Sequence, residues 1–293
     1  MLPPEAEIID VRYSRHGGTL AGRASAVGVL ARQGALRAMG ARRGWRAKLI
    51  PILLVLAAMG PALVVLGVRA LFAEFSDRSP VDILDALPYA DYQSVIGVVI
   101  LLFAVVLAPD LLCPDRRDGT LALYFATAVG RDEYVAGRFL GCAVPLLLVT
   151  LAPMLLLFGG VAFFDDDPYG YVAAEWQQLP RIVAAGVILA VYYASVALAV
   201  AAFTSRKAYA VGGYVLILVA TTAVAVLIQE SLGRARYIEV AEVSTMPIEL
   251  VRLLWPETSG ETTTPWWAFA AAYCAIVGVA WWLVVRRYRR EQV

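Results

Sequence analysis

The sequence predicts an all-α polytopic membrane protein with six transmembrane helices, and three observations lead to this fold class. Hydrophobic residues make up 60% of the 293 residues, charged residues only 17%, and the mean hydropathy is +0.70. Six stretches of at least 18 residues contain no Asp, Glu, Lys or Arg. Basic and acidic residues concentrate in alternate links between those stretches. Together these features exclude a soluble two-domain enzyme, a disordered chain and a disulfide-stabilised scaffold.

The six uncharged stretches can each cross a bilayer, because about 20 helical residues at about 1.5 Å each cover a hydrocarbon core of about 30 Å. The predicted spans are residues 49–68, 92–109, 139–164, 182–205, 208–229 and 262–285. They form a transmembrane domain of residues 49–293, which follows a basic N-terminal arm of residues 1–48. The turn from Thr204 to Lys207 is so short that the fourth and fifth spans are expected to form a tight antiparallel hairpin.

Charge predicts which side of the membrane each link faces. Of the 25 basic residues, 19 lie in the arm, the link 110–138, the turn 206–207 and the tail after residue 285. The other three links hold 15 of the 24 acidic residues. Because basic residues concentrate in cytoplasmic segments, both termini are predicted to be cytoplasmic. The use of arginine in place of lysine, with many Ala, Gly and Val residues, indicates a GC-rich bacterial genome and therefore a bacterial plasma membrane.

Two further segments are expected beside the membrane. Between Arg23 and Lys48 a basic residue recurs every few positions, which favours either a helix on the inner leaflet or a partly irregular basic arm. The outer link 230–261 contains an apolar segment, Met246–Trp255, that is expected to form a short helix resting on the outer surface or dipping into it.

The longest cytoplasmic link, residues 110–138, carries the clearest local pattern. Pro114 is expected to end the second span, and residues 115–118 are expected to form a charged cluster. Gly119 allows a turn, after which Thr120 can cap a short helix over residues 121–128.

The third span is expected to begin at the end of this link. Gly130 breaks the short helix, and Arg131 leads into the span with acidic residues in its first turn. The short helix contains Leu121, Leu123, Tyr124 and Phe125, which are too apolar for a helix that meets only water. Either a partner protein or the membrane surface should therefore cover this helix.

This link resembles the loop that joins the second and third of six helices in permeases of ABC-2 type transporters. That loop reads E-R-R-x-G-T-L-E, then apolar residues, then P-V-S-R and G-K. The matching residues here are Asp115, Arg116, Arg117, Asp118, Gly119, Thr120, Leu121, Val129, Gly130, Arg131, Tyr134, Gly137 and Arg138. The chain departs from the pattern at Ala122, Ala128, Gly130 and Arg138. The resemblance in topology covers about residues 23–293, including the basic ending at 286–290.

The resemblance implies an ABC-2 permease fold, like that of type V exporters, with a coupling helix that docks on a separate ATPase. The coupling residues that it implies are Asp115, Arg116, Arg117, Gly119, Thr120, Leu121, Tyr124, Phe125, Arg131, Tyr134 and Arg138. The implied partners are two cytoplasmic ABC ATPase subunits, which would bind ATP and magnesium, a second permease copy or paralogue, and membrane lipids. No nucleic acid is expected. Two copies are expected to meet through the first and fifth spans, where Gly212 and Gly213 permit close approach.

The expected activity is ATP-driven export of an amphipathic, lipid-like or drug-like substrate. The chain has no G-x-x-x-x-G-K-[ST] motif, so ATP is expected to bind the partner subunit. An ion-coupled secondary transporter and an intramembrane enzyme are the weaker alternatives, because no long span has an acidic residue in its middle. No catalytic, cofactor or metal site is expected in the chain. Tyr192, Tyr193 and Tyr214 either line the substrate path or pack between helices.

Overall fold

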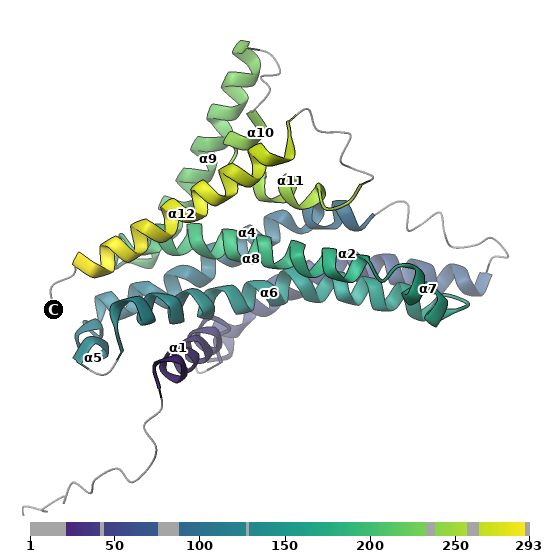
Figure 1. Cartoon of the computed structure of the whole chain (residues 1–293). Coiled ribbons are helices and arrows are strands. Elements are labelled where there is room, and N and C mark those ends of the chain that lie inside the picture. The colour runs from purple at the N-terminus through teal and green to yellow at the C-terminus, as the bar shows by residue number, and fades with distance from the viewer. Residues whose placement is uncertain are drawn as a thin grey trace, which may run out of the picture.

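The computed structural model describes residues 22–41, 44–75, 88–126, 129–232, 238–256 and 264–290. Its helices are α1 (Arg23–Ala38), α2 (Trp45–Phe75), α4 (Tyr89–Arg117), α5 (Leu121–Ala126), α6 (Arg131–Phe163), α7 (Pro168–Ala174), α8 (Gln178–Ala201), α9 (Lys207–Leu232), α10 (Ile238–Ala241), α11 (Met246–Arg252) and α12 (Trp266–Arg290) (Figure 1). Within the described residues, six of these helices are long and apolar enough to cross a membrane: α2, α4, α6, α8, α9 and α12. The all-α class and the number of spans are therefore confirmed.

The centre of the bundle is formed by α4, α6 and α8, which lie along one another (Figure 1). Two polar side chains of α4 inside this region donate to backbone carbonyls of neighbouring helices. The Tyr92 hydroxyl of α4 donates to the Ala58 carbonyl of α2 at 2.8 Å. The neighbouring Gln93 Nε2 donates to the Thr150 carbonyl of α6 at 3.1 Å. These bonds fix the depth of α4 relative to the helices on either side.

The two ends of the bundle carry different elements (Figure 1). One end, called here the α5 end, holds α5, the turn between α8 and α9, and the last turn of α12. The opposite end, the α7 end, holds α7 and the start of α8. The three parts of the α5 end come from three of the four segments that the charge pattern predicts on one side of the membrane: the link 110–138, the turn 206–207 and the C-terminal tail.

The N-terminal arm is helical from Arg23 to Ala38, and this α1 helix packs against α6. Gly40 follows it with a φ of 71°, and the Ala41 N–H donates to the Leu36 carbonyl at 2.8 Å, which closes the helix with a glycine C-cap. A Cβ placed on Gly141 of α6 would lie 3.1 Å from the Gly34 Cα of α1. The backbones of α1 and α6 therefore touch where both lack side chains.

The prediction that the fourth and fifth spans form a tight antiparallel hairpin is wrong. The turn between α8 and α9 is short, but α9 then diverges from α8 and most of its side chains remain exposed (Figure 1). A short turn sets only the distance between the two helix ends, and other elements set the angle. Here α12 packs on α8, while α9 packs against α4 and α10 as well as α8.

The described part of the link between the fifth and sixth spans packs into the bundle instead of resting on it. Tyr192 and Tyr193 lie beyond the middle of α8, and their hydroxyls donate to the carbonyls of Val243 at 3.0 Å and Ser244 at 2.7 Å. The next helix, α11, is inserted so closely that a Cβ on Gly97 of α4 would lie 2.6 Å from Ile248 Cδ1. The segment of residues 238–252 is therefore re-entrant, and the predicted short helix ends at Arg252, not at Trp255.

Candidate functional site

The turn between α4 and α5 begins one helical turn later than predicted. The prediction that Pro114 ends the second span is wrong, because α4 runs through it to Arg117. Proline lacks only its own N–H, and its carbonyl still accepts the Asp118 N–H at 2.9 Å. Gly119 then has a φ of 68°, in the left-handed region that glycine adopts without strain. The expected turn at Gly119 is therefore present.

Thr120 stabilises the end of α4 and does not use its hydroxyl to cap the next helix. Its N–H and its Oγ1 both donate to the Asp115 carbonyl, at 3.1 and 3.2 Å. The short helix that follows, α5, runs from Leu121 to Ala126. Residues 127 and 128, which were predicted to extend it, lie outside the described residues.

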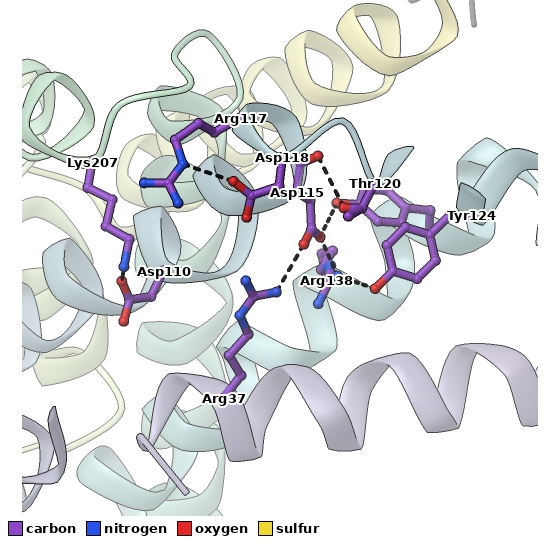
Figure 2. A network of polar contacts seen from close by, with 10 residues as sticks. Arg37, Asp110, Asp115, Arg117, Asp118, Thr120, Tyr124, Arg138 and Lys207 are labelled. Carbon is purple, nitrogen blue, oxygen red and sulfur yellow. Dashed lines mark hydrogen bonds and ion pairs between the residues drawn. The ribbon is translucent and has the colours of Figure 1, made fainter. Parts of the chain in front are cut away.

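A buried carboxylate, Asp115, links three helices at this position (Figure 2). Its Oδ1 accepts from Arg37 Nη1 of α1 at 2.9 Å, and its Oδ2 accepts from the Tyr134 hydroxyl of α6 at 2.8 Å. Arg138 Nη2, also of α6, donates to the same Oδ2. The side chains of Asp115 and Arg138 are 4% and 3% exposed, so this ion pair is withdrawn from solvent. These four side chains are called here the Asp115 cluster.

The α5 helix packs against the Asp115 cluster through two aromatic side chains. The Tyr124 hydroxyl accepts from Arg138 Nη2 at 3.2 Å (Figure 2). The ring centroids of Tyr124 and Tyr134 lie 5.5 Å apart. Phe125 contacts Tyr134 edge to face at 5.8 Å. Leu121 is buried as well. The position of α5 is therefore determined by the same residues that neutralise Asp115.

The opposite face of α5 is exposed. Leu123 is 70% exposed, and Ala122 and Ala126 are exposed beside it. The sequence predicts that a partner or the membrane covers the apolar side chains of this helix. Leu123 points away from the bundle, whereas Leu121, Tyr124 and Phe125 are covered by the chain itself to different degrees.

The predicted charged cluster of residues 115–118 is wrong, because these side chains point in different directions. Asp115 is turned inward, as described above. Arg116 donates to the Ala202 carbonyl at the end of α8, so it ties the turn between α8 and α9 to α4. Arg117 pairs with Asp118 at 2.9 Å on the exposed side. Four consecutive residues of a helix end cannot face one another, since each is rotated by about 100° from the last.

The first turn of α6 is joined to the last turn of α12. Arg131 Nη1 donates to the Arg289 carbonyl at 2.9 Å, and Arg289 in turn pairs with Asp132 at 2.7 Å. The ring centroids of Tyr134 and Tyr288 lie 5.4 Å apart. A cleft of about 580 Å³ opens beside these residues, between the ends of α1, α5, α6 and α12. All helix ends of this region are thus joined to one another around α5.

A family model described as ABC-2 family transporter protein matches residues 35–285. The chain belongs to this family. No curated protein matches the chain. Family membership and the six apolar helices identify it as a multi-pass membrane permease of an ABC transporter. The family provides the membrane component of its transporters, and it normally works with separate ABC ATPase subunits.

Two residues of this ABC-2 permease have roles that the sequence did not reveal. Arg37 completes the Asp115 cluster from a helix 78 residues away, where the sequence shows only one arginine among many in a basic arm. Glu242 is brought into the bundle by the re-entrant segment, and its Oε1 accepts from Thr222 of α9 at 3.0 Å. Glu242 lies in the link between the fifth and sixth spans, so the absence of acidic residues from the middle of the spans is unaffected.

The glycines predicted at a subunit contact differ in their surroundings. A Cβ on Gly212 would meet nothing within 4 Å, whereas a Cβ on Gly213 would lie 3.4 Å from Val200 Cγ1 of the same chain. Only Gly212 is therefore open on its outer side. Tyr192, Tyr193 and Tyr214 are buried between helices, which fits the packing interpretation for these tyrosines.

Proposed function

We propose that this permease is the membrane-spanning subunit of an ATP-driven exporter, powered by separate ATPase subunits that bind ATP and magnesium. The observation that carries the proposal is α5, a short helix with an exposed apolar face and a buried ion-pair cluster behind it. A helix held this firmly can transmit movement instead of absorbing it. The expected substrate is amphipathic, lipid-like or drug-like, because the described transmembrane surface is overwhelmingly apolar.

The α5 end is proposed to face the cytoplasm of a bacterial cell, with both termini on that side. The charge distribution of the links supports this orientation. At this end α5 would contact the ATPase through Leu123, while Tyr124 and Phe125 would keep the helix in place from behind. Arg131 and the mixed charges of the neighbouring cleft would orient the ATPase by charge-assisted hydrogen bonds.

Movement of α5 would reach several helices at once. Arg138 and Tyr134 carry it to α6, Asp115 carries it to α4, and Arg37 carries it to α1. The Arg116 bond adds the end of α8. The ATPase would therefore reorient most of the bundle through one contact, which is what alternating access to a substrate path requires.

A second permease, either another copy or a paralogue, is proposed to cover the exposed apolar faces of α2 and α9. Both helices have most of their long side chains exposed, including Leu53 and Leu56 of α2 and Leu216 and Leu227 of α9. Gly212, which is open on its outer side, permits close approach of a neighbouring helix there.

The coupling role of α5 is tested by Leu123→Asp. Burying a leucine at an interface contributes about 1.5 to 3 kcal/mol, so introducing a charge there should reduce co-purification of the ATPase at least about tenfold. The matched control is Trp176→Asp, which adds the same charge at a similarly exposed apolar position near the α7 end. The control should retain the ATPase. Undiminished ATPase recovery with Leu123→Asp, in a variant that still inserts and folds, would refute the coupling role.

A further inference from the structure

A surface cleft of about 500 Å³ lies between α8, α9 and α12. Both α9 and α12 pack on α8, and α9 diverges from the bundle, so the cleft lies in the angle between these helices (Figure 1). Its lining is apolar throughout, from Phe203 beyond the end of α8 to Val243 of the segment of residues 238–252. The volume is within the range of small-molecule sites, and the lining suits a hydrocarbon chain.

Arg206 lies beyond the α5 end of this cleft, on the face of α9 that lines it. Its carbonyl accepts from the Ala210 N–H at 3.2 Å, so Arg206 already follows the helical course of α9. It precedes the lining residues Gly213 and Ile217 by seven and eleven positions, about two and three helical turns. At about 100° per residue, Arg206 therefore lies within about 20° of both around the helix axis.

Arg286 has the equivalent position on α12. It follows the lining residues Val279 and Ala275 by seven and eleven positions, so it also lies within about 20° of both around its helix. Because α9 begins and α12 ends at the α5 end, both arginines lie beyond the same end of the cleft (Figure 1). Two of the three helices that line the cleft thus continue into an arginine on the lining face.

Both guanidinium groups are available to an anion. Arg206 and Arg286 are exposed, and within the described residues neither forms an ion pair. Each lies over an aromatic ring, Arg206 at 5.8 Å from the Tyr209 centroid and Arg286 at 4.7 Å from the Trp282 centroid. Arginine together with Trp or Tyr at the end of a span is typical of the level of the lipid headgroups.

We propose that this cleft binds an acidic phospholipid from the leaflet at the α5 end, with an acyl chain in the cleft and its phosphate at Arg206 and Arg286. Basic pockets between transmembrane helices bind such headgroups, and guanidinium N–H groups form charge-assisted hydrogen bonds to phosphate oxygens. The lipid would fill the angle between α9 and α12 and so support the direction in which α9 leaves the bundle. This binding site goes beyond the proposed transport function and does not depend on it.

A second permease copy is the competing occupant of the cleft. A copy with the same orientation in the membrane would bring the arginines of its own α5 end to this place, and like charges disfavour such a contact. The side chains of α9 that we assign to the subunit contact, Leu216 and Leu227, lie about 80 to 100° around the helix from Ile217. The cleft is therefore expected to stay open to lipid when that contact forms.

The experiment measures lipid binding to the full-length chain in neutral detergent by native mass spectrometry. The probes are phosphatidylglycerol and phosphatidylcholine with identical acyl chains, which differ in net charge. The wild type should bind phosphatidylglycerol at least about tenfold more tightly. The double variant Arg206→Gln, Arg286→Gln should raise the Kd for phosphatidylglycerol at least about tenfold. The control Arg32→Gln, Arg46→Gln removes two other exposed arginines and should change the Kd less than about threefold.

A second pair of variants tests whether the acyl chain lies in the cleft. Ala275→Trp narrows the cleft and leaves both arginines in place, so it should raise the Kd for phosphatidylglycerol at least about fivefold. Ala223→Trp makes the same change about 120° around α9 from Ile217 and should leave the Kd unchanged. Both alanines are exposed, so both variants are expected to fold, and their thermal unfolding is compared with that of the wild type.

Four results would overturn the proposal. Equal affinity of the wild type for the two lipids would show that the headgroup charge is not recognised. Unchanged phosphatidylglycerol binding after loss of Arg206 and Arg286, or equal losses in the two double variants, would show that these arginines do not form the site. Unchanged binding by Ala275→Trp would place the acyl chain elsewhere. Dimers that exclude phosphatidylglycerol would identify a second copy as the occupant.

Discussion

Replacing Asp115 by asparagine tests whether the Asp115 cluster determines the stability of the region around α5. The substitution preserves the shape of the side chain and one acceptor oxygen, and it removes the negative charge that neutralises Arg138. Because the Arg138 side chain is only 3% exposed, its charge cannot be hydrated after the change. Breaking a buried ion pair in this way costs about 3 to 5 kcal/mol. We expect about 3 kcal/mol, since the amide oxygen can still accept one hydrogen bond.

The assay heats the purified full-length chain and monitors its unfolding by the reaction of the buried cysteines with a thiol-reactive dye. Cys113 is buried two residues before Asp115, so its labelling also reports local opening of this end of α4. A loss of about 3 kcal/mol corresponds to a decrease in Tm of about 6 to 12 °C for a protein of this size.

The control is Asp118→Asn, which breaks an ion pair with the neighbouring Arg117 in the same turn. The side chains of Arg117 and Asp118 are 70% and 48% exposed, so this pair should contribute less than about 1 kcal/mol. We therefore expect a large decrease in Tm for Asp115→Asn and a small decrease for Asp118→Asn, only three positions away. Equal shifts in the two variants would show that burial of the Asp115 pair does not determine its contribution.

Two further predictions concern packing and orientation. Gly141→Val should separate α1 from α6 and lower the free energy of unfolding by about 1 to 3 kcal/mol, because its Cβ would lie 3.1 Å from the Gly34 backbone. The control is Gly159→Val, because a Cβ on Gly159 would meet nothing within 4 Å. Equal Tm values for the two variants would contradict the close contact. In a background without the native cysteines, a cysteine replacing Asp166 should react with an impermeant thiol reagent on intact cells, and one replacing Asp118 should not. The reverse labelling pattern would show that the orientation is inverted.

The spans could be predicted from the sequence because each depends on local composition alone. A run of uncharged residues as long as 139–164 must be placed somewhere apolar, whatever it packs against. The same holds for the turn at Gly119, which depends on the backbone freedom of one residue. The sequence does not predict that α4 continues through Pro114. Proline disfavours a helix in the turn before it, but it does not prevent the next turn from being helical.

The contacts that build the site could not be predicted, because they join residues far apart in the sequence. Arg37 is one of several arginines in a basic arm, and only the crossing of α1 over α6 selects it for Asp115. Glu242 lies in a link that contains other acidic residues, and its bond to Thr222 forms where two tyrosine hydroxyls of α8 hold the carbonyls of Val243 and Ser244. The angle of α9 likewise depends on its packing against α4 and α10, not on the turn that precedes it.

The length of α4 has a mechanical consequence for the permease. This one helix contacts the re-entrant segment at Gly97 and the Asp115 cluster near its other end, about 27 Å away along its axis. It can therefore act as a lever: a rotation of about 4° about the cluster would displace the Gly97 end by about 2 Å, enough to repack Ile248. Two prolines lie between the two contacts: Pro109 lacks the N–H that would bond to the Val105 carbonyl, and Pro114 lacks the one that would bond to the Asp110 carbonyl. The stiffness of these two turns would determine how much of a movement at the α5 end reaches the Gly97 end of α4.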